Sequence, residues 1–278
     1  MNEPRVSIIK ASFSALFLVF WCIFGALTMT VAKVMRLRLA ESFPLFFHAL
    51  VCRLCSLRCE IEGTPSAVQP TLYVANHVSY LDVFVLGGLL NGSSVAKSDV
   101  ASWPVFGKLA KLQNTLFLER NPRRAPEQIQ AVRNHLQQEG NLIMFPEGTS
   151  TAGTYVGSFR SSLFAAADNV CVQPVTVAYV SYAGVRMTQH IRDRYAWYLP
   201  NPKEYPTTPN RPFASHLVAV MGLRRCTVKV RFHEPVTMTP GKRKECAQYC
   251  ESAVRRGLVE LLGPGPAAIA SAELTSPT

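Results

Sequence analysis

The first long run of apolar residues lies near the N-terminus. Residues 11–32 (ASFSALFLVFWCIFGALTMTVA) carry no charged side chain over 22 positions. A helix rises about 1.5 Å per residue, so this run is long enough to cross a hydrocarbon layer of about 30 Å. Basic residues follow at Lys33, Arg36 and Arg38, which favours an uncleaved anchor over the main alternative, a cleaved signal peptide. We therefore expect residues 1–43 to form a single membrane anchor, with the rest of the chain on the cytoplasmic side because cations gather beside the anchor.

The next segment mixes apolar and basic positions at helical spacing. In residues 44–59, which begin at Pro44, apolar residues recur three or four positions apart, and Arg53 and Arg58 lie between them. This pattern predicts an amphipathic helix of the kind that lies on a bilayer surface. A helix that packs on the core of a domain would show the same pattern, so both interpretations stand.

From residue 57 onward, short apolar runs alternate with longer amphipathic ones. The runs typical of strands are 57–62, 71–76, 93–97, 114–119, 141–146, 171–180 and 226–232. The runs typical of helices are 82–90, 103–112, 125–138, 160–168 and 242–262. This alternation predicts an α/β fold, with a mostly parallel or mixed sheet flanked by helices. We expect one domain over residues 44–262, with a surface loop at 200–212 and a disordered tail at 263–278.

The charge balance favours an anionic partner. The chain has 29 Lys and Arg against 18 Asp and Glu, a formal net charge of +11, and either nucleic acid or an acidic membrane surface would attract it. The sequence has neither a zinc-finger spacing nor the aromatic strand motif of RNA-binding domains, so we do not expect nucleic acid as a partner. The eight cysteines lack a second pair at metal-ligand spacing, which favours free buried thiols in a reducing compartment over a metal or redox site.

A histidine and an aspartate follow the second expected strand. His77 comes directly after the apolar run and Asp82 lies five residues later, at the start of an expected helix. A histidine that removes a proton from a hydroxyl needs an acceptor on its second ring nitrogen, and a carboxylate supplies one. The turn from strand to helix can bring the two side chains together. Ser79-Tyr-Leu-Asp82 also fits a helix capping box, so Asp82 has a purely structural alternative.

Charged residues also end the expected strand 114–119. Glu119 and Arg120 follow its apolar positions, and a planar guanidinium suits an anionic head group because it can bind two oxygens at once. Charged residues after a strand are usually solvated, so this pair alone is a weak signal.

The expected strand 141–146 leads into a glycine turn. Glu147, Gly148 and Thr149 follow it, and the backbone N–H groups of such a turn can bind a phosphate or an oxyanion. Ligands in open α/β sheets collect at the carboxyl ends of strands. We therefore expect the residues that end these three strands to meet at one site.

In conjunction, these strand ends resemble the sequence blocks of the glycerolipid acyltransferases, the 1-acylglycerol-3-phosphate acyltransferase family. The four blocks stand here as NHVSYLD (76–82), FLER (117–120), FPEGT (145–149) and VQPVTV (172–177). The first and third are specific, and the resemblance covers about residues 57–236. Arg160 resembles the basic residue that follows the third block in many members.

The resemblance implies a membrane-bound O-acyltransferase that moves a fatty acyl group from acyl-CoA or acyl carrier protein to the free hydroxyl of a lysolipid. It implies that His77 is the general base and that Asp82 orients it. A thioester is already activated, so no metal or redox cofactor is expected and the carrier is a co-substrate. The residues expected to bind substrate are Asn76, Ser79, Glu119, Arg120, Glu147, Gly148, Thr149 and Arg160.

Two departures from the family pattern bear on the acceptor. Asn114 stands where the second block often has glycine, and Ser150 stands where phosphatidate-making members often have arginine. The second departure removes a cation and raises lyso-ornithine lipid as an alternative acceptor. We expect lysophosphatidate, because Arg120 and the turn at 147–149 are present. A third interpretation, from another class, is a non-catalytic membrane protein that binds lipid on the same fold.

Overall fold

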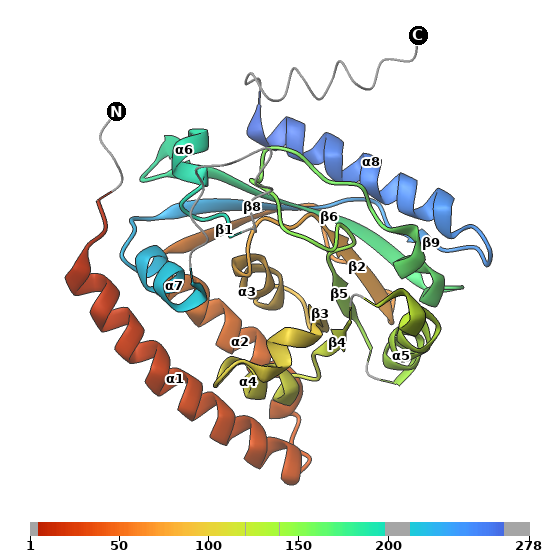
Figure 1. The fold of residues 1–278 in the computed structure, drawn as a ribbon, viewed down its shortest axis with the longest axis horizontal. Helices are drawn as coiled ribbons and strands as arrows, with labels where there is room; N and C mark the ends of the chain where they lie inside the picture. Colours follow the sequence, from red (N-terminus) through yellow and green to blue (C-terminus); the bar gives the residue numbers. More distant parts are fainter. Residues whose placement is uncertain (1–4, 120, 139, 198–211, 264–278) are drawn as a thin grey trace.

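A mixed sheet forms the centre of the molecule (Figure 1). The computed structural model describes residues 5–119, 121–138, 140–197 and 212–263. Within them the sheet has nine strands, seven of which follow the order β1 (Leu57–Glu62), β8 (Cys226–Phe232), β6 (Cys171–Tyr182), β2 (Thr71–Ala75), β5 (Leu142–Met144), β3 (Ser93–Lys97) and β4 (Leu116–Leu118). Two short strands, β7 (Val185–Arg186) and β9 (Val236–Thr237), pair with β6. β6 and β8 are antiparallel, while β1 with β8 and the run from β6 to β4 are parallel. The expected fold class is confirmed.

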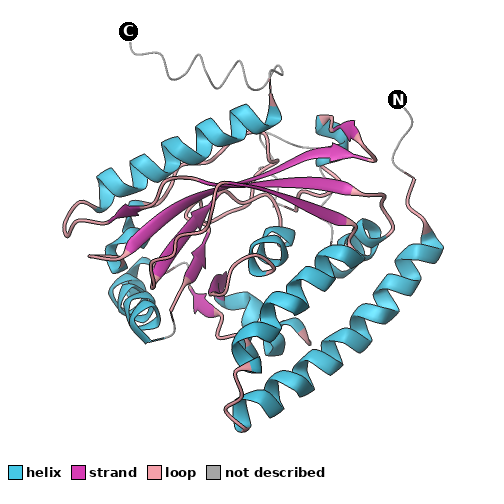
Figure 2. Cartoon of the chain, turned by 180° about the vertical axis from the view of Figure 1, so that it is seen from behind, coloured by secondary structure: helices cyan, strands magenta, loops and turns pink. Residues whose placement is uncertain are grey.

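Helices cover both faces of this sheet (Figures 1 and 2). Every residue of β2 is buried, as expected for a strand covered on both faces. One hydrophobic cluster joins the sheet to α1 (Ile8–Val34), α2 (Leu39–Leu54), α3 (Leu81–Gly87), α4 (Phe106–Leu112) and α7 (Phe213–Met221). A second cluster joins the other face to α5 (Ala125–Gln138), to the 3₁₀ helix η3 (Ser161–Ala166) and to α8 (Arg243–Leu262). Shorter elements are η1 (Ser98–Ser102), η2 (Pro122–Arg124) and α6 (Gln189–Arg192).

The chain leaves β2 and β5 in opposite directions. These two strands are parallel neighbours, with Val74 opposite Met144. After β2 the chain passes through α3 to β3, whereas after β5 it passes through η3 to β6 on the far side of β2. Such a reversal opens a crevice at the carboxyl ends of the strands, where ligands bind in open α/β sheets. His77 and Glu147 each lie three residues beyond the paired positions, so the register brings them together at this edge.

α1 packs along the domain by one of its faces. Leu18, Trp21 and Met29 on that face are buried in the core, and α1 contacts α2, α4 and α7. Gly25 lets α2 approach, since a Cβ there would lie 3.0 Å from the ring of Phe47. The expected boundary between residues 43 and 44 therefore falls inside α2, which is packed against α1.

Several expected boundaries move. The helix expected at 44–59 begins at Leu39 and ends at Leu54, because a positive φ of 55° at Ser56 turns the chain into β1. Pro44 lies inside the helix, since its fixed φ is compatible with helical geometry although its missing N–H costs one bond. The helix expected at 160–168 is the shorter η3, and α7 was not expected. Apart from Pro212 and Gly263, the expected loop at 200–212 and tail at 263–278 lie outside the described residues.

Candidate active site

His77 lies directly beyond β2 with its backbone held on both sides. Its N–H donates to Oε1 of Glu147 at 2.7 Å, and its carbonyl accepts from the N–H of Thr151 at 2.8 Å. Its ring stacks on Phe145, with centroids 4.2 Å apart and planes at 24°. The side chain is 21% exposed and lines a cavity. The imidazole is therefore fixed in orientation while one edge remains accessible.

Asp82 lies in the first turn of α3 and is fully buried. Its Oδ2 is 2.9 Å from Nδ1 of His77 and also accepts from the N–H groups of Val78 at 2.6 Å and Ser79 at 2.9 Å. Its Oδ1 accepts from the hydroxyl of Tyr179 at 2.8 Å. One carboxylate thus caps the turn and holds the histidine, so both sequence-based interpretations of Asp82 apply. Because an ionised carboxylate only accepts, Nδ1 carries the proton and Nε2 is the basic nitrogen.

Asn76 and Ser79, which were expected to bind substrate, do not line the cavity. Both are fully buried. The Asn76 amide donates to the carbonyl of Val177 at 2.9 Å and accepts from the N–H of Val177 at 2.8 Å. Ser79 accepts from the N–H of Leu81 at 3.4 Å, at the start of α3. They hold the strand end and the helix start that carry His77 and Asp82.

Glu147 also supports the site from behind. It is buried, its Oε1 accepts from His77, and its Oε2 accepts from the N–H of Gly157 at 2.7 Å. Burial raises the pKa of Glu147 to about 8, although the two backbone donors oppose this shift. The carboxyl group of Glu147, which was expected to contact a head group, does not line the cavity and braces the backbone around His77.

The glycine turn positions Arg160 at the cavity wall. Gly148 has φ +68°, and a Cβ there would lie 2.9 Å from Cζ of Arg160. The N–H of Gly148 donates to the carbonyl of Phe145 at 3.1 Å, so it is not available to an anion as the sequence suggested. Exposed Thr149 and exposed Arg160 both line the cavity.

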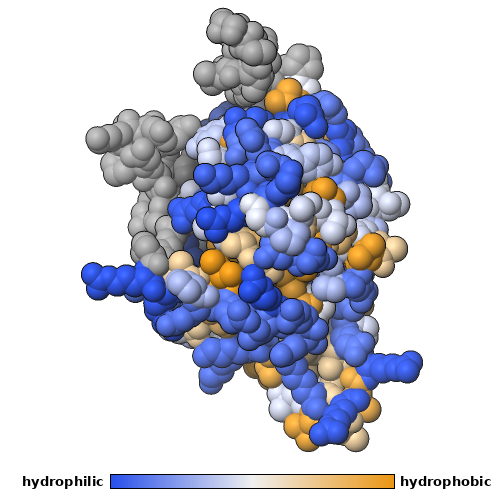
Figure 3. Space-filling view, turned by 90° about the vertical axis from the view of Figure 1, so that its right-hand side faces the viewer, coloured by the Kyte–Doolittle hydropathy of each residue, from blue (hydrophilic) through white to orange (hydrophobic). Residues whose placement is uncertain are grey.

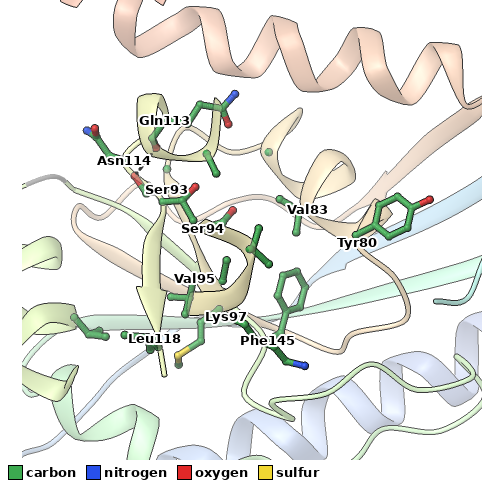
Figure 4. A pocket seen from close by; sticks show the side chains of 18 of the residues that line it. Tyr80, Val83, Ser93, Ser94, Val95, Lys97, Gln113, Asn114, Leu118 and Phe145 are labelled. Carbon is green, nitrogen blue, oxygen red and sulfur yellow. Dashed lines mark hydrogen bonds between the residues drawn. The ribbon is translucent and has the colours of Figure 1, made fainter. Parts of the chain in front are cut away.

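A cavity of about 1410 Å³ is lined by residues of this edge of the sheet, of the helices α1 to α4 and of α5. Figure 4 shows it from Gln113 at one end to Lys97 and Phe145 at the other. Its catalytic end has polar and charged lining, whereas side chains of α1 to α4 make much of the remaining wall apolar: Met29, Phe47, Val83, Phe84, Phe106 and Leu109. An alkyl chain fits the apolar part while a polar group stays beside His77.

The structure describes one of the two charged residues of the second block. Glu119 lines the cavity, but its Oε1 lies 2.6 Å from Nη1 of Arg124, and both side chains are largely exposed. An exposed pair of this kind is worth little and rearranges easily. Arg120 lies outside the described residues.

Three residues of the site were not expected from the sequence. Phe145 was part of a recognised block, but nothing in the pattern indicated that it stacks on His77. Tyr179 is one of several hydroxyl-bearing residues in a mostly apolar strand, and nothing in the sequence distinguished it from the others. Lys97 lines the cavity at the end of β3, and the signal that singled out Glu119, a charge at the end of an apolar strand, would have found it.

The arrangement supplies one basic nitrogen, a buried carboxylate that stabilises its protonated form, and a cavity with an apolar wall. In the part of the chain that the structure describes, no group of three or more His, Cys, Asp or Glu residues could hold a metal ion. A base held in this way can remove the proton from a hydroxyl as its oxygen attacks an acyl group.

Comparisons with known proteins show similarity to acyltransferases. The sequence profile of the Acyltransferase family matches residues 58–180. The chain is 35% identical to the lyso-ornithine lipid O-acyltransferase of Rhodobacter capsulatus over 221 residues, which cover 75% of this chain and 74% of that protein. It is 37% identical to the 1-acyl-sn-glycerol-3-phosphate acyltransferase of Neisseria gonorrhoeae over 119 residues, covering 42% and 47% of the two chains.

A solved structure has the same fold. The crystal structure of the 1-acyl-sn-glycerophosphate acyltransferase PlsC from Thermotoga maritima superposes with a TM-score of 0.60, over 93% of this chain and 95% of that one, at 21% identity. The expected family resemblance is confirmed by the profile and the relatives together. The chain belongs to the acyltransferase family, and it is an acyltransferase that acts on lysolipids.

Proposed function

We propose that this enzyme transfers a fatty acyl group from a thioester to the free hydroxyl of lyso-ornithine lipid. The extent of the similarity carries this proposal. The relatives from Rhodobacter capsulatus and Brucella abortus, both lyso-ornithine lipid O-acyltransferases, align over about three quarters of this chain. The lysophosphatidate enzyme of Neisseria gonorrhoeae aligns over 42% of it. This choice reverses the preference for lysophosphatidate that the sequence blocks alone suggested.

The proposed reaction uses the His77–Asp82 pair directly. Nε2 of His77 takes the proton of the acceptor hydroxyl while the hydroxyl oxygen attacks the thioester carbonyl. Asp82, 2.9 Å from Nδ1, stabilises the imidazolium that forms. The tetrahedral intermediate then expels the thiolate of the carrier, and His77 returns the proton to that sulfur. An ester forms and a thioester breaks without any redox change, so the proposed reaction needs no metal or redox cofactor. The donor is the acyl thioester of acyl carrier protein or of coenzyme A.

The charges at the catalytic end of the cavity suit an amino-acid head group. Lys97, Arg160 and Glu119 all line the cavity. The two cations suit a carboxylate, and Glu119 can exchange its exposed partner Arg124 for an ammonium group. Ser150, where an additional cation would favour a phosphate, instead donates its hydroxyl to the carbonyl of Trp197 at 2.7 Å. A zwitterionic head group matches this mixture of charges better than a phosphate monoester does.

Lysophosphatidate is the second candidate, because the Neisseria relative carries that activity in its name. The test is to measure kcat/KM for both acceptors with one donor. We expect lyso-ornithine lipid to be preferred by at least about tenfold, equal to about 1.4 kcal/mol of transition-state stabilisation. An equal or greater preference for lysophosphatidate would overturn the proposed acceptor.

A non-catalytic lipid-binding protein is tested by changing the proposed base. His77→Ala should lower kcat by about 10²–10⁴, as is typical when a general base is lost. The ring is partly exposed at the cavity wall, so the melting temperature should change little. Turnover near that of the wild type in a folded His77→Ala sample would show that this residue is not the base.

We also propose that α1 attaches the enzyme to the cytoplasmic surface of a membrane. α1 is long and apolar enough to cross a bilayer, and its outer face exposes residues such as Phe13 (69%), Phe20 (61%) and Leu27 (65%). Near its ends, however, Lys10 donates to Ser56 at 2.6 Å and Lys33 to Asn114 at 2.6 Å, both in the catalytic domain. A helix tied at both ends to one domain supports insertion along one leaflet rather than across the bilayer.

The turn between α1 and α2 fits the same attachment. Exposed Met35, Leu37 and Leu39 alternate there with Arg36 and Arg38. Figure 3 shows hydrophobic and hydrophilic residues intermixed at the lower end of the molecule, where α1 ends and α2 begins in Figure 1. Apolar side chains can enter the bilayer at this turn while the cations meet anionic head groups.

A further inference from the structure

Behind the catalytic pair lies a buried tyrosine that does not touch the cavity. Tyr179 belongs to β6 and is 1% exposed. Its hydroxyl donates to Oδ1 of Asp82 at 2.8 Å, while Oδ2 of the same carboxylate accepts from His77. Tyr179 does not line the cavity. Its hydroxyl therefore bonds to the carboxylate oxygen that His77 does not use.

The surrounding structure fixes this hydroxyl in place. Two residues earlier in β6, the backbone of Val177 exchanges two hydrogen bonds with the Asn76 amide, at 2.9 and 2.8 Å. These two bonds join β6 to Asn76, which lies one position beyond the end of β2 and directly before His77. On the other side, Nε of buried Arg192 donates to the carbonyl of Tyr179 at 3.3 Å. The phenol ring also packs on buried Tyr195, with centroids 5.9 Å apart.

Because both partners in this bond are buried, water is excluded from it and the phenol remains the donor. Asp82 and Tyr179 are both inaccessible to water, so no solvent molecule can replace the hydroxyl if it is removed. Burial, with a further contribution from Asp82, raises the pKa of Tyr179 well above its usual value. The phenol therefore stays protonated and can donate at any working pH.

We propose that Tyr179 is a positioning residue for acyl transfer, which acts through Asp82 by fixing the carboxylate and spreading its negative charge. The dyad thus extends across the sheet as His77–Asp82–Tyr179. The inference rests on the proposed use of His77 as base, but it does not depend on which lysolipid is the acceptor. Removing the hydroxyl leaves Oδ1 buried without this donor. The negative charge then concentrates on the carboxylate, so Asp82 attracts the imidazolium of His77 more strongly. The carboxylate is also less well oriented, because one of its bonds is lost.

The other titratable and charged groups around His77, Asp82 and Tyr179 must be kept constant in the test. Glu147, from the loop after β5, bonds to the backbone of His77 and interacts with Asp82. Tyr179 also interacts with Cys226 of β8 and Cys52 of α2, and its carbonyl accepts from Arg192. None of these groups is altered by a substitution that removes only the phenol oxygen.

The test compares Tyr179→Phe with Tyr195→Phe. Tyr195 is an equally buried neighbour whose hydroxyl donates to the carbonyl of Arg224 at 3.2 Å, whereas the hydroxyl of Tyr179 donates to Asp82. In Tyr179→Phe we expect kcat to fall by roughly three- to tenfold, with KM for donor and acceptor unchanged, since a bond to a charged group is lost outside the cavity. The acid limb of the kcat/KM profile should move to higher pH. Tyr195→Phe should change neither quantity.

A readout without turnover separates this inference from the proposed function. In detergent-solubilised protein, the proton on Nδ1 of His77 should give a downfield NMR resonance that is absent from His77→Ala. It should shift in Tyr179→Phe and stay in place in Tyr195→Phe. If the resonance, kcat and the acid limb of Tyr179→Phe all match Tyr195→Phe, Tyr179 is merely structural and the inference is wrong. Wild-type enzyme that fails on lyso-ornithine lipid but shows the shift overturns only the proposed acceptor.

Discussion

Replacing Asp82 by asparagine isolates the charge of the carboxylate from its geometry. In Asp82→Asn, the amide oxygen can take the place of Oδ2 and keep accepting from His77, Val78 and Ser79. The amide nitrogen then faces the hydroxyl of Tyr179, which rotates to accept instead of donating. The cap of α3 and the tautomer of His77 are retained, so what is lost is the negative charge beside the imidazolium.

The size of the effect follows from that separation. Nδ1 of His77 lies 2.9 Å from Oδ2 of Asp82, which places the two charge centres about 4 Å apart. At an effective dielectric constant of about 20, two unit charges at about 4 Å attract by about 4 kcal/mol. The proton is only partly transferred in the transition state, so about 2–4 kcal/mol is lost, equal to a fall in kcat of roughly 30- to 1,000-fold.

The assay is single-donor turnover of purified Asp82→Asn in mixed micelles, with melting temperature measured on the same samples. Asp168→Asn is the matched control, because Asp168 undergoes the same chemical change in a partly exposed pair with Arg133 at 3.4 Å. It should retain wild-type turnover. The smallest expected fall in kcat is about 30-fold. If folded Asp82→Asn loses less than about threefold, so that more than about a third of wild-type kcat remains, the charge of Asp82 does not assist proton transfer and the reasoning fails.

Three further predictions concern the bracing acid, the glycine turn and α1. Burial raises the pKa of Glu147 to about 8 from an ordinary value of 4.5. The stability that this group contributes is therefore full below pH 4.5 and is lost as pH rises through about 8. In Glu147→Gln, the free energy of unfolding measured in urea should fall less steeply over this range. Gly148→Ala places a Cβ 2.9 Å from Cζ of Arg160 at a φ of +68°, so it should displace the guanidinium and raise KM for the acceptor by roughly tenfold. Phe20→Ser with Leu27→Ser alters side chains that are 61% and 65% exposed, so co-sedimentation with anionic vesicles should fall while the melting temperature is kept.

Each of these has a control and a contradicting outcome. A slope of stability against pH that persists in Glu147→Gln would assign the titration to another group. Gly184→Ala has a similar φ of +87° with nothing within 4 Å of the added Cβ; an equal rise in KM there would show that backbone strain, rather than contact with Arg160, is responsible. Val185→Ser removes an equally exposed apolar side chain (69%) away from α1, and an equal loss of vesicle binding would contradict attachment through α1.

Local patterns indicated the His77–Asp82 pair and most of the elements. His77 and Asp82 are five residues apart across one turn, so the turn from strand to helix allows their contact. Asp82 also fits a helix cap, and it was the conjunction with the other sequence blocks that favoured the pair as a site. The strands β1, β3 and β8 begin and end where expected, because their apolar runs are bounded by turn residues. Boundaries failed where tertiary contacts override local preference, as in α2, whose apolar face packs on α1 and tolerates Pro44.

The partners behind and around the catalytic pair were decided by the tertiary structure. Tyr179 lies 97 residues from Asp82 along the chain and meets it because β6 is placed beside β2. The same placement turns Asn76 away from the cavity and onto β6. Glu147 was visible as a residue at a strand end, but the register of β5 on β2 makes it a brace for the backbone of His77. Strand order and register arise from the packing of the whole core, and a contact between distant segments leaves no periodic signal in either segment, so the sequence determined the chemistry of the pair and the fold determined its support.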